Sequence, residues 1–171
     1  TLPHGTSRLH VENRLHKPAT MTKESVYFAF PFNADAESIA FEITGGVATA
    51  QSPHVPGSAR HFRAIRHWAT LQGKTPIAWA TTEAPLVQVG NIHLPYAPFE
   101  TTILPDDVHA ATIYSWALNN IWDTNFPPQQ GGEMAFRYTI ATGQNADLLG
   151  PDTGASASQP LIGVIAPLAG D

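Results

Sequence analysis

The stretch that decides the fold is TIYSWALNNIWDTNFPPQQGGEMAFRYTIA, residues 112–141. Apolar and polar side chains alternate from Thr112 to Leu118 and again from Met134 to Ile140, as they do in strands that bury one face. A connection rich in Asn, Pro, Gln and Gly joins the two runs. The stretch predicts a strand, a polar loop and a second strand. Because loops held by a rigid scaffold commonly carry binding residues, this loop is the first place to look for a ligand.

Further short strands are predicted along the chain, separated by Pro and Gly. The run SVYFAF at Ser25–Phe30 is apolar on both faces, which predicts a central strand rather than an edge strand. Residues 62–71 fit a helix or a strand, and we favour a strand after a turn near Gly57. The other predicted strands are residues 8–15, 39–43, 77–81 and 86–89. Short strands at fairly regular spacing predict an all-β fold, an antiparallel β-sandwich, over residues 1–142.

The segment Gly143–Ser158 is rich in Ala, Gly, Ser, Asp and Asn and shows little periodicity. Such a composition predicts little regular structure. Residues 143–171 are therefore expected to form a flexible or poorly ordered tail.

Composition argues against several classes of partner. Only 13% of residues are charged and the formal net charge is −5, so a nucleic-acid partner is not expected. The densest basic patch, between Arg60 and Lys74, is small and is interpreted as solvated edge residues. No apolar run is long enough for a membrane span, and no signal peptide is visible, which favours a cytoplasmic location. The chain has no cysteine, so disulfides and thiolate metal sites are excluded. It opens at Thr1 and enters a strand almost at once, which suggests a piece of a longer protein.

Motifs for catalysis or metal binding do not emerge from the sequence. There is no His-Glu-x-x-His pattern, G-x-S-x-G elbow or phosphate loop. Asp106 and Asp107 follow a proline and are typical of a turn, and Asp107 with His109 makes only a two-ligand match of a kind common by chance. Glu133 is expected to be solvated. Asp123 is the one carboxylate worth testing for ligand contact, and neither catalytic nor metal-ligating residues are predicted in this chain.

Carbohydrate contact is the chemistry that the polar loop favours. Sugar sites combine planar amides and carboxylates with an aromatic ring. The loop supplies this set, with Gln129 and Gln130 close by, and the candidate substrate-binding residues are Asn119, Asn120, Trp122, Asp123, Thr124 and Asn125. The alternative is a capped turn, with Asn side chains bonding the backbone and Trp122 closing the edge of the core. Trp68, Trp79 and Trp116 lie within alternating runs and are expected in the core.

Six motifs in one order resemble a known family. They are ENRLHKPA (12–19), KESVYFAFPF (23–32), VPGSARHFRAIRHWATL (55–71), TTEAPLVQVGNI (81–92), YSWALNNIWDTNF (114–126) and GGEMAFRYTIA (131–141). In wording and order they resemble the C-terminal β-rich region of glycoside hydrolase family 38, the retaining α-mannosidases, in its bacterial branch. The resemblance covers roughly Arg8 to Thr142 and implies a supersandwich-like region, similar to galactose mutarotase-like domains, within a larger glycoside hydrolase.

The resemblance also implies where the chemistry resides. In the family, zinc, the nucleophilic Asp and the acid catalyst belong to an N-terminal domain, and no segment here matches the His-x-Asp zinc motif. No catalytic or zinc-binding residue is carried over, and zinc is expected only in the catalytic domain of the parent. The chain is expected to pack on that domain and to contribute loop contacts to a mannoside. The alternatives are a stand-alone carbohydrate-binding module with Trp122 as its platform, and a purely structural domain.

Overall fold

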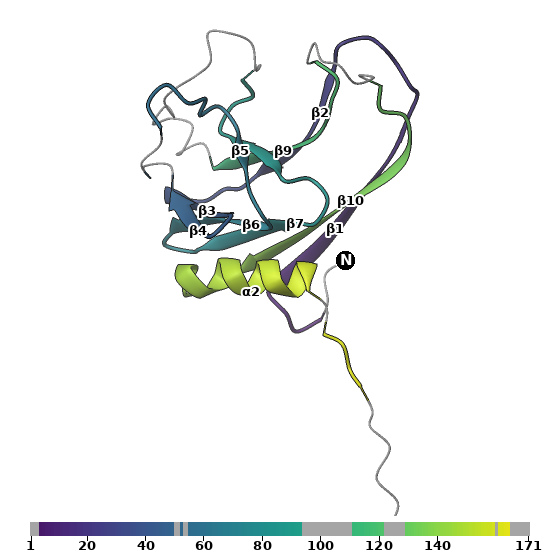
Figure 1. Cartoon of the computed structure of the whole chain (residues 1–171). Coiled ribbons are helices and arrows are strands. Elements are labelled where there is room, and N and C mark those ends of the chain that lie inside the picture. The colour runs from purple at the N-terminus through teal and green to yellow at the C-terminus, as the bar shows by residue number, and fades with distance from the viewer. Residues whose placement is uncertain are drawn as a thin grey trace, which may run out of the picture.

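The computed structural model describes residues 4–49, 52, 55–93, 111–121, 129–159 and 161–164. It confirms the all-β prediction, with two antiparallel sheets and one helix in the described ranges (Figure 1). Sheet A has six strands in the order β1 (Arg8–Lys17), β10 (Gly132–Thr142), β7 (Ile77–Thr81), β6 (Trp68–Gly73), β3 (Ala36–Ile43) and β4 (Gly46–Thr49). Sheet B has four, in the order β2 (Ser25–Pro31), β9 (Thr112–Asn119), β8 (Leu86–Val89) and β5 (Arg63–Ala64). Helix α2 spans Ala146–Ser158.

The core lies between the two sheets and is built around aromatic rings. Trp79 stacks on Tyr138 with ring centroids 5.4 Å apart, and Phe30 of sheet B packs on the same Tyr138 at 4.7 Å. All three tryptophans expected in the core are buried, with exposed fractions of 5% for Trp68, 0% for Trp79 and 3% for Trp116. Only Trp79 belongs to the main cluster between the sheets. The alternation of strands places Trp68 and Trp116 on the outer faces, where other elements cover them.

The strand Ser25–Phe30 corrects one prediction, because β2 is the end strand of sheet B in the described structure and not a central one. Its apolar character on both faces has a different cause. Phe28 and Phe30 point into the core between the sheets. On the opposite face Tyr27 stacks on Trp116, with ring centroids 5.6 Å apart. An edge strand that is covered on both faces therefore reads in sequence like a central one.

Residues 62–71 contain strand rather than helix, as favoured, since β5 and the start of β6 lie there. The expectation of little regular structure in Gly143–Ser158 is wrong. Helix α2 lies on the outer face of sheet A and packs on β6, β7 and β10 (Figure 1). Asn145 caps it, because its Oδ1 accepts hydrogen bonds from the backbone N–H of Asp147 (3.0 Å) and Leu148 (3.4 Å). This helix is too short and too polar to cross a membrane, and no other helix occurs among the described residues.

Sequence periodicity missed α2 because its buried face is made of small residues. Gly150, Thr153 and Gly154 are the buried positions, and the two glycines lie directly against the ring of Trp68. Glycine and the internal Pro151 both lower helix propensity, so the helix depends on packing against the sheet.

Tyr138 should make the stability of the fold decrease at alkaline pH. Its hydroxyl lies 3.0 Å from Ser115 Oγ between the sheets, and burial raises the pKa of Tyr138 to about 12. The unfolded chain loses this proton near pH 10, whereas the folded chain keeps it, so the free energy of unfolding should fall as pH rises from 10 to 12. Urea unfolding across this range should show the loss, at most about 2–3 kcal/mol from this group. The loss should shrink in Tyr138→Phe, and an unchanged pH profile in that variant would contradict the assignment.

Candidate functional site

The predicted loop begins where β9 ends. Asn119 is the last residue of β9 and Asn120 follows it directly. The candidate residues Trp122, Asp123, Thr124 and Asn125 lie outside the described residues, as do Asp106, Asp107 and His109. The strands that flank the loop belong to different sheets, β9 to sheet B and β10 to sheet A. The loop therefore joins the two layers of the sandwich and is not the turn of a hairpin.

Asn120 anchors the start of the loop. Its side chain is buried, with 5% exposed. Its Oδ1 accepts a hydrogen bond from the Glu24 N–H (2.7 Å), and its Nδ2 donates to the carbonyls of Thr20 (3.2 Å) and Thr22 (2.7 Å). The Asn120 backbone N–H also donates to the Glu24 carbonyl at 3.0 Å. Both side-chain amide hydrogens are thus used inside the protein, as the capped-turn alternative predicts, so Asn120 positions the loop and is poorly placed to donate to a ligand.

The other end of the loop is tied to the same place. The Asn119 backbone N–H donates to Gln130 Oε1 at 3.1 Å, which links β9 to the residue two before β10. Gly131 passes so close to Ala19 that an added Cβ would lie 2.9 Å from the Ala19 nitrogen and 3.0 Å from its Cβ. Residues 19–24, 119–120 and 130–131 therefore meet at one point, which we call the loop base.

An ion pair between a buried lysine and a partly exposed glutamate closes the remaining side of the loop base. Lys17 is the last residue of β1, and its ammonium group pairs with the carboxylate of Glu24, one residue before β2. The Lys17 side chain is only 10% exposed. The pair holds both ends of the segment 18–23, to which Asn120 bonds. Sequence reasoning missed Lys17, Glu24 and the role of Gln130, because their partners are distant in the chain or lie in an unpatterned loop.

An aromatic cluster lies beside the loop base on the outer face of sheet B. Trp116 stacks on Tyr27, and Phe62 meets the Trp116 ring edge to face at 5.6 Å. Burial raises the pKa of Tyr27, and the neighbouring Ser25 side chain partly opposes the rise. Ser25 pairs with Asn119 and Tyr27 pairs with Trp116, with a register shift between Val26 and Tyr27. Because Ser25 and Tyr27 are two residues apart in β2, they lie on one face, and this face connects the cluster to the end of β9. Trp116, at the centre of the cluster, is buried and offers no open ring to a ligand, whereas Tyr27 and Phe62 are partly exposed.

The described residues contain no group of three or more His, Asp or Glu side chains placed to hold a metal ion. Among the described carboxylates, those of Glu12, Glu24 and Glu83 pair with Arg or Lys. Those of Glu42 and Glu133 lie beside the rings of His67 and His16. No protein family, curated protein or solved structure matches the chain in comparisons with known proteins.

Proposed function

We propose that the chain is an accessory β-sandwich of an α-mannosidase-like glycoside hydrolase and that the loop after β9 contacts the sugar. The observation that carries the proposal is the loop base. Asn120 and Gln130 hold the two ends of a segment that contains Trp122 and Asp123. The six ordered motifs that resemble glycoside hydrolase family 38 supply the choice of enzyme class.

A pinned base suits a loop that binds. Ordering a free loop on association costs conformational entropy, so a loop fixed at both ends loses less on binding. Binding groups also need support from residues that are themselves locked in place. Asn120, with four hydrogen bonds to residues 20–24, gives such support. The loop sequence brings one indole, amides and a carboxylate, groups that can stack on a sugar ring and bond its hydroxyls.

The parent reaction under this proposal is hydrolysis of an α-mannoside with retention, in which zinc and both catalytic carboxylates belong to another domain of the same protein. Under this proposal, the partner of this chain is that catalytic domain. The loop after β9 contacts the sugar bound there through residues such as Trp122 and Asn125. The alternative, a stand-alone carbohydrate-binding module, uses the same loop without a partner.

Trp122→Ala tests the sugar-binding role. We expect binding of methyl α-D-mannopyranoside to weaken by about tenfold or more, because stacking on an indole and its apolar contact are lost. The melting temperature should stay within about 1–2 °C, as for a surface substitution. Isothermal titration and thermal unfolding measure the two quantities.

Trp116→Phe is the matched control, since it alters an indole near the loop base that is buried. It should lower stability and leave sugar affinity unchanged. If Trp122→Ala instead lowers stability strongly and leaves sugar binding as it was, Trp122 is a core residue and the proposed role is wrong.

A further inference from the structure

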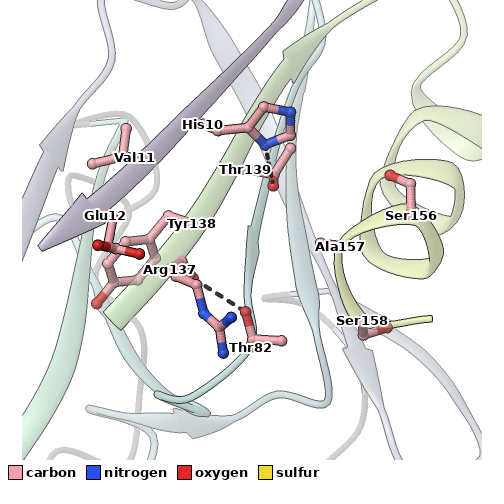
Figure 2. A pocket seen from close by; sticks show the side chains of 10 residues that line it. All are labelled: His10, Val11, Glu12, Thr82, Arg137, Tyr138, Thr139, Ser156, Ala157 and Ser158. Carbon is pink, nitrogen blue, oxygen red and sulfur yellow. Dashed lines mark hydrogen bonds between the residues drawn. The ribbon is translucent and has the colours of Figure 1, made fainter. Parts of the chain in front are cut away.

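A groove lies between the last turn of helix α2 and strands β1 and β10 of sheet A (Figure 2). Helix α2 packs on β6, β7 and β10, and Arg8 of β1 reaches it through a hydrogen bond from Nη1 to Ser156 Oγ at 2.6 Å. The space beside the helix has a volume of about 640 Å³. That volume lies within the range of small-molecule sites in proteins.

The floor of the groove is set by the register of β1 and β10. His10 pairs with Thr139 and Glu12 pairs with Arg137. Residues directly opposite each other in an antiparallel pair project from the same face. The His10 Nδ1 lies 3.1 Å from Thr139 Oγ1, and Figure 2 shows these side chains on the sheet side of the groove, facing the last turn of α2.

Arg137 is held in place as a hydrogen-bond donor. Its backbone N–H and its Nε–H donate to the Glu83 carboxylate at 2.8 Å and 2.6 Å, and its Nη2 completes the ion pair. A guanidinium has five N–H groups, so about three remain after the two side-chain contacts with Glu83. The Arg137 side chain is 65% exposed. The remaining donors are therefore accessible, and the side chain that carries them is fixed.

The hydroxyl groups around the groove present oxygen rather than hydrogen. Ser158 Oγ donates to the Gly154 carbonyl at 2.7 Å, and Ser156 Oγ donates to the Thr153 carbonyl at 3.0 Å. Thr82 Oγ1 donates to the Arg137 carbonyl at 3.4 Å. Each hydroxyl has one hydrogen, which these bonds use. Ser156 Oγ also accepts from Arg8 Nη1 at 2.6 Å, and the oxygens of Thr82 and Ser158 keep acceptor capacity. The carboxylate of Glu12 adds further acceptors on the sheet side.

The charges at the groove are compensated within the protein. The negative end of the α2 dipole lies at this groove. Arg8 of β1 compensates it, since its Nη1 donates to Ser156 Oγ in the last turn at 2.6 Å. The Arg137 charge is already paired with Glu83, and the Glu12 charge with Arg14 at 2.6 Å. A ligand here must donate to the oxygens of Ser158 and Glu12 and accept from Arg137 without bringing net charge. Hydroxyl groups do both.

We propose that this groove binds a neutral, hydroxyl-rich molecule of the size of a mono- or disaccharide. The site is separate from the loop base and does not depend on the function proposed above. Because Tyr138 is buried and offers no stacking surface, binding rests on hydrogen bonds, and a dissociation constant of about 1–10 mM is expected.

The test is a ¹H–¹⁵N NMR titration of the whole chain with methyl α-D-mannopyranoside, and separately with inorganic phosphate. Saturable shifts are expected for the sugar at the amides of Thr82, Arg137, Thr139, Ser156 and Ser158, and weaker or absent ones for phosphate. Glu12→Gln should weaken sugar binding at these amides by roughly tenfold, the effect of one hydrogen bond to a charged group. Arg137→Gln should do the same.

Glu133→Gln is the matched control, because Glu133 lies on the same face of β10, four residues from Arg137, and does not line the groove. It should leave the sugar shifts unchanged. Shifts confined to residues 119–130 would locate the sugar at the loop and overturn the groove site without touching the proposed function. Binding of phosphate alone, or sugar shifts that persist in both groove variants, would also overturn it. The exposed position of Glu12 keeps the test valid even if Arg137→Gln unfolds the protein.

Discussion

Replacing Asn120 with alanine is expected to lower the free energy of unfolding by about 3 kcal/mol. The side chain makes three hydrogen bonds to the backbone of residues 20–24 from a buried position. Removing it leaves the Glu24 N–H and the carbonyls of Thr20 and Thr22 without these partners. Each buried backbone group left unsatisfied costs about 1–3 kcal/mol, less where water can reach it. Urea unfolding, followed by tryptophan fluorescence, measures the change.

Asn119→Ala is the matched control for this prediction. Asn119 reaches Gln130 through its backbone N–H, which alanine keeps, so this substitution should cost less than about 1 kcal/mol. Equal losses at the two positions would show that Asn120 is not the anchor of the loop base. If the loop after β9 contacts the sugar as proposed, Asn120→Ala should also weaken sugar binding, because the loop then loses its fixed end.

Alanine at Gly150 or Gly154 is expected to destabilise the protein by about 2 kcal/mol, against the usual trend for helices. Glycine to alanine within a helix normally stabilises by about 0.5–1 kcal/mol. Here an added Cβ at either position would fall inside van der Waals contact with the ring of Trp68, and at Gly150 also with the Thr70 hydroxyl. The ring is rigid and buried, so the helix must lift or the ring must move, as in other overpacked interiors.

Pro151→Ala provides the comparison on the same helix. Pro151 is exposed and lies between the two glycines, so this change should raise stability through helix propensity alone. Thermal unfolding of the three variants and of the unaltered chain separates the effects. If both glycine variants were more stable than the unaltered chain, α2 could not pack on Trp68 as described.

Strand positions were predictable because each strand packs against a core. The alternation at Arg8–Leu15 and the apolar run at Ser25–Phe30 correspond to β1 and β2. The place of β2 in its sheet was not predictable, because the Tyr27–Trp116 stack buries its outer face, and apolar residues on both faces are also typical of a central strand. Which strands pair depends on contacts between distant residues, such as Val11 with Tyr138, and no local pattern encodes them.

Helix α2 escaped prediction for a related reason. Amphipathic periodicity marks a helix that buries large apolar side chains, whereas α2 buries Gly150, Thr153 and Gly154. Its partner, Trp68, contributes the bulk from the sheet side. At the candidate site, the sequence pointed to the segment around Asn119 and Asn120 but could not separate a ligand contact from an anchor. That distinction needs the positions of Thr20, Thr22 and Glu24.

The measurement that tests the account most directly is hydrolysis of p-nitrophenyl α-D-mannopyranoside with added zinc, run on this chain and on the longer protein that the proposal requires. The proposal predicts hydrolysis by the longer protein and none by this chain alone. Zinc-dependent turnover by the isolated chain would contradict it, since the catalytic carboxylates would then have to lie in this sequence. A longer protein without activity on the mannoside would contradict the assignment to an α-mannosidase-like enzyme.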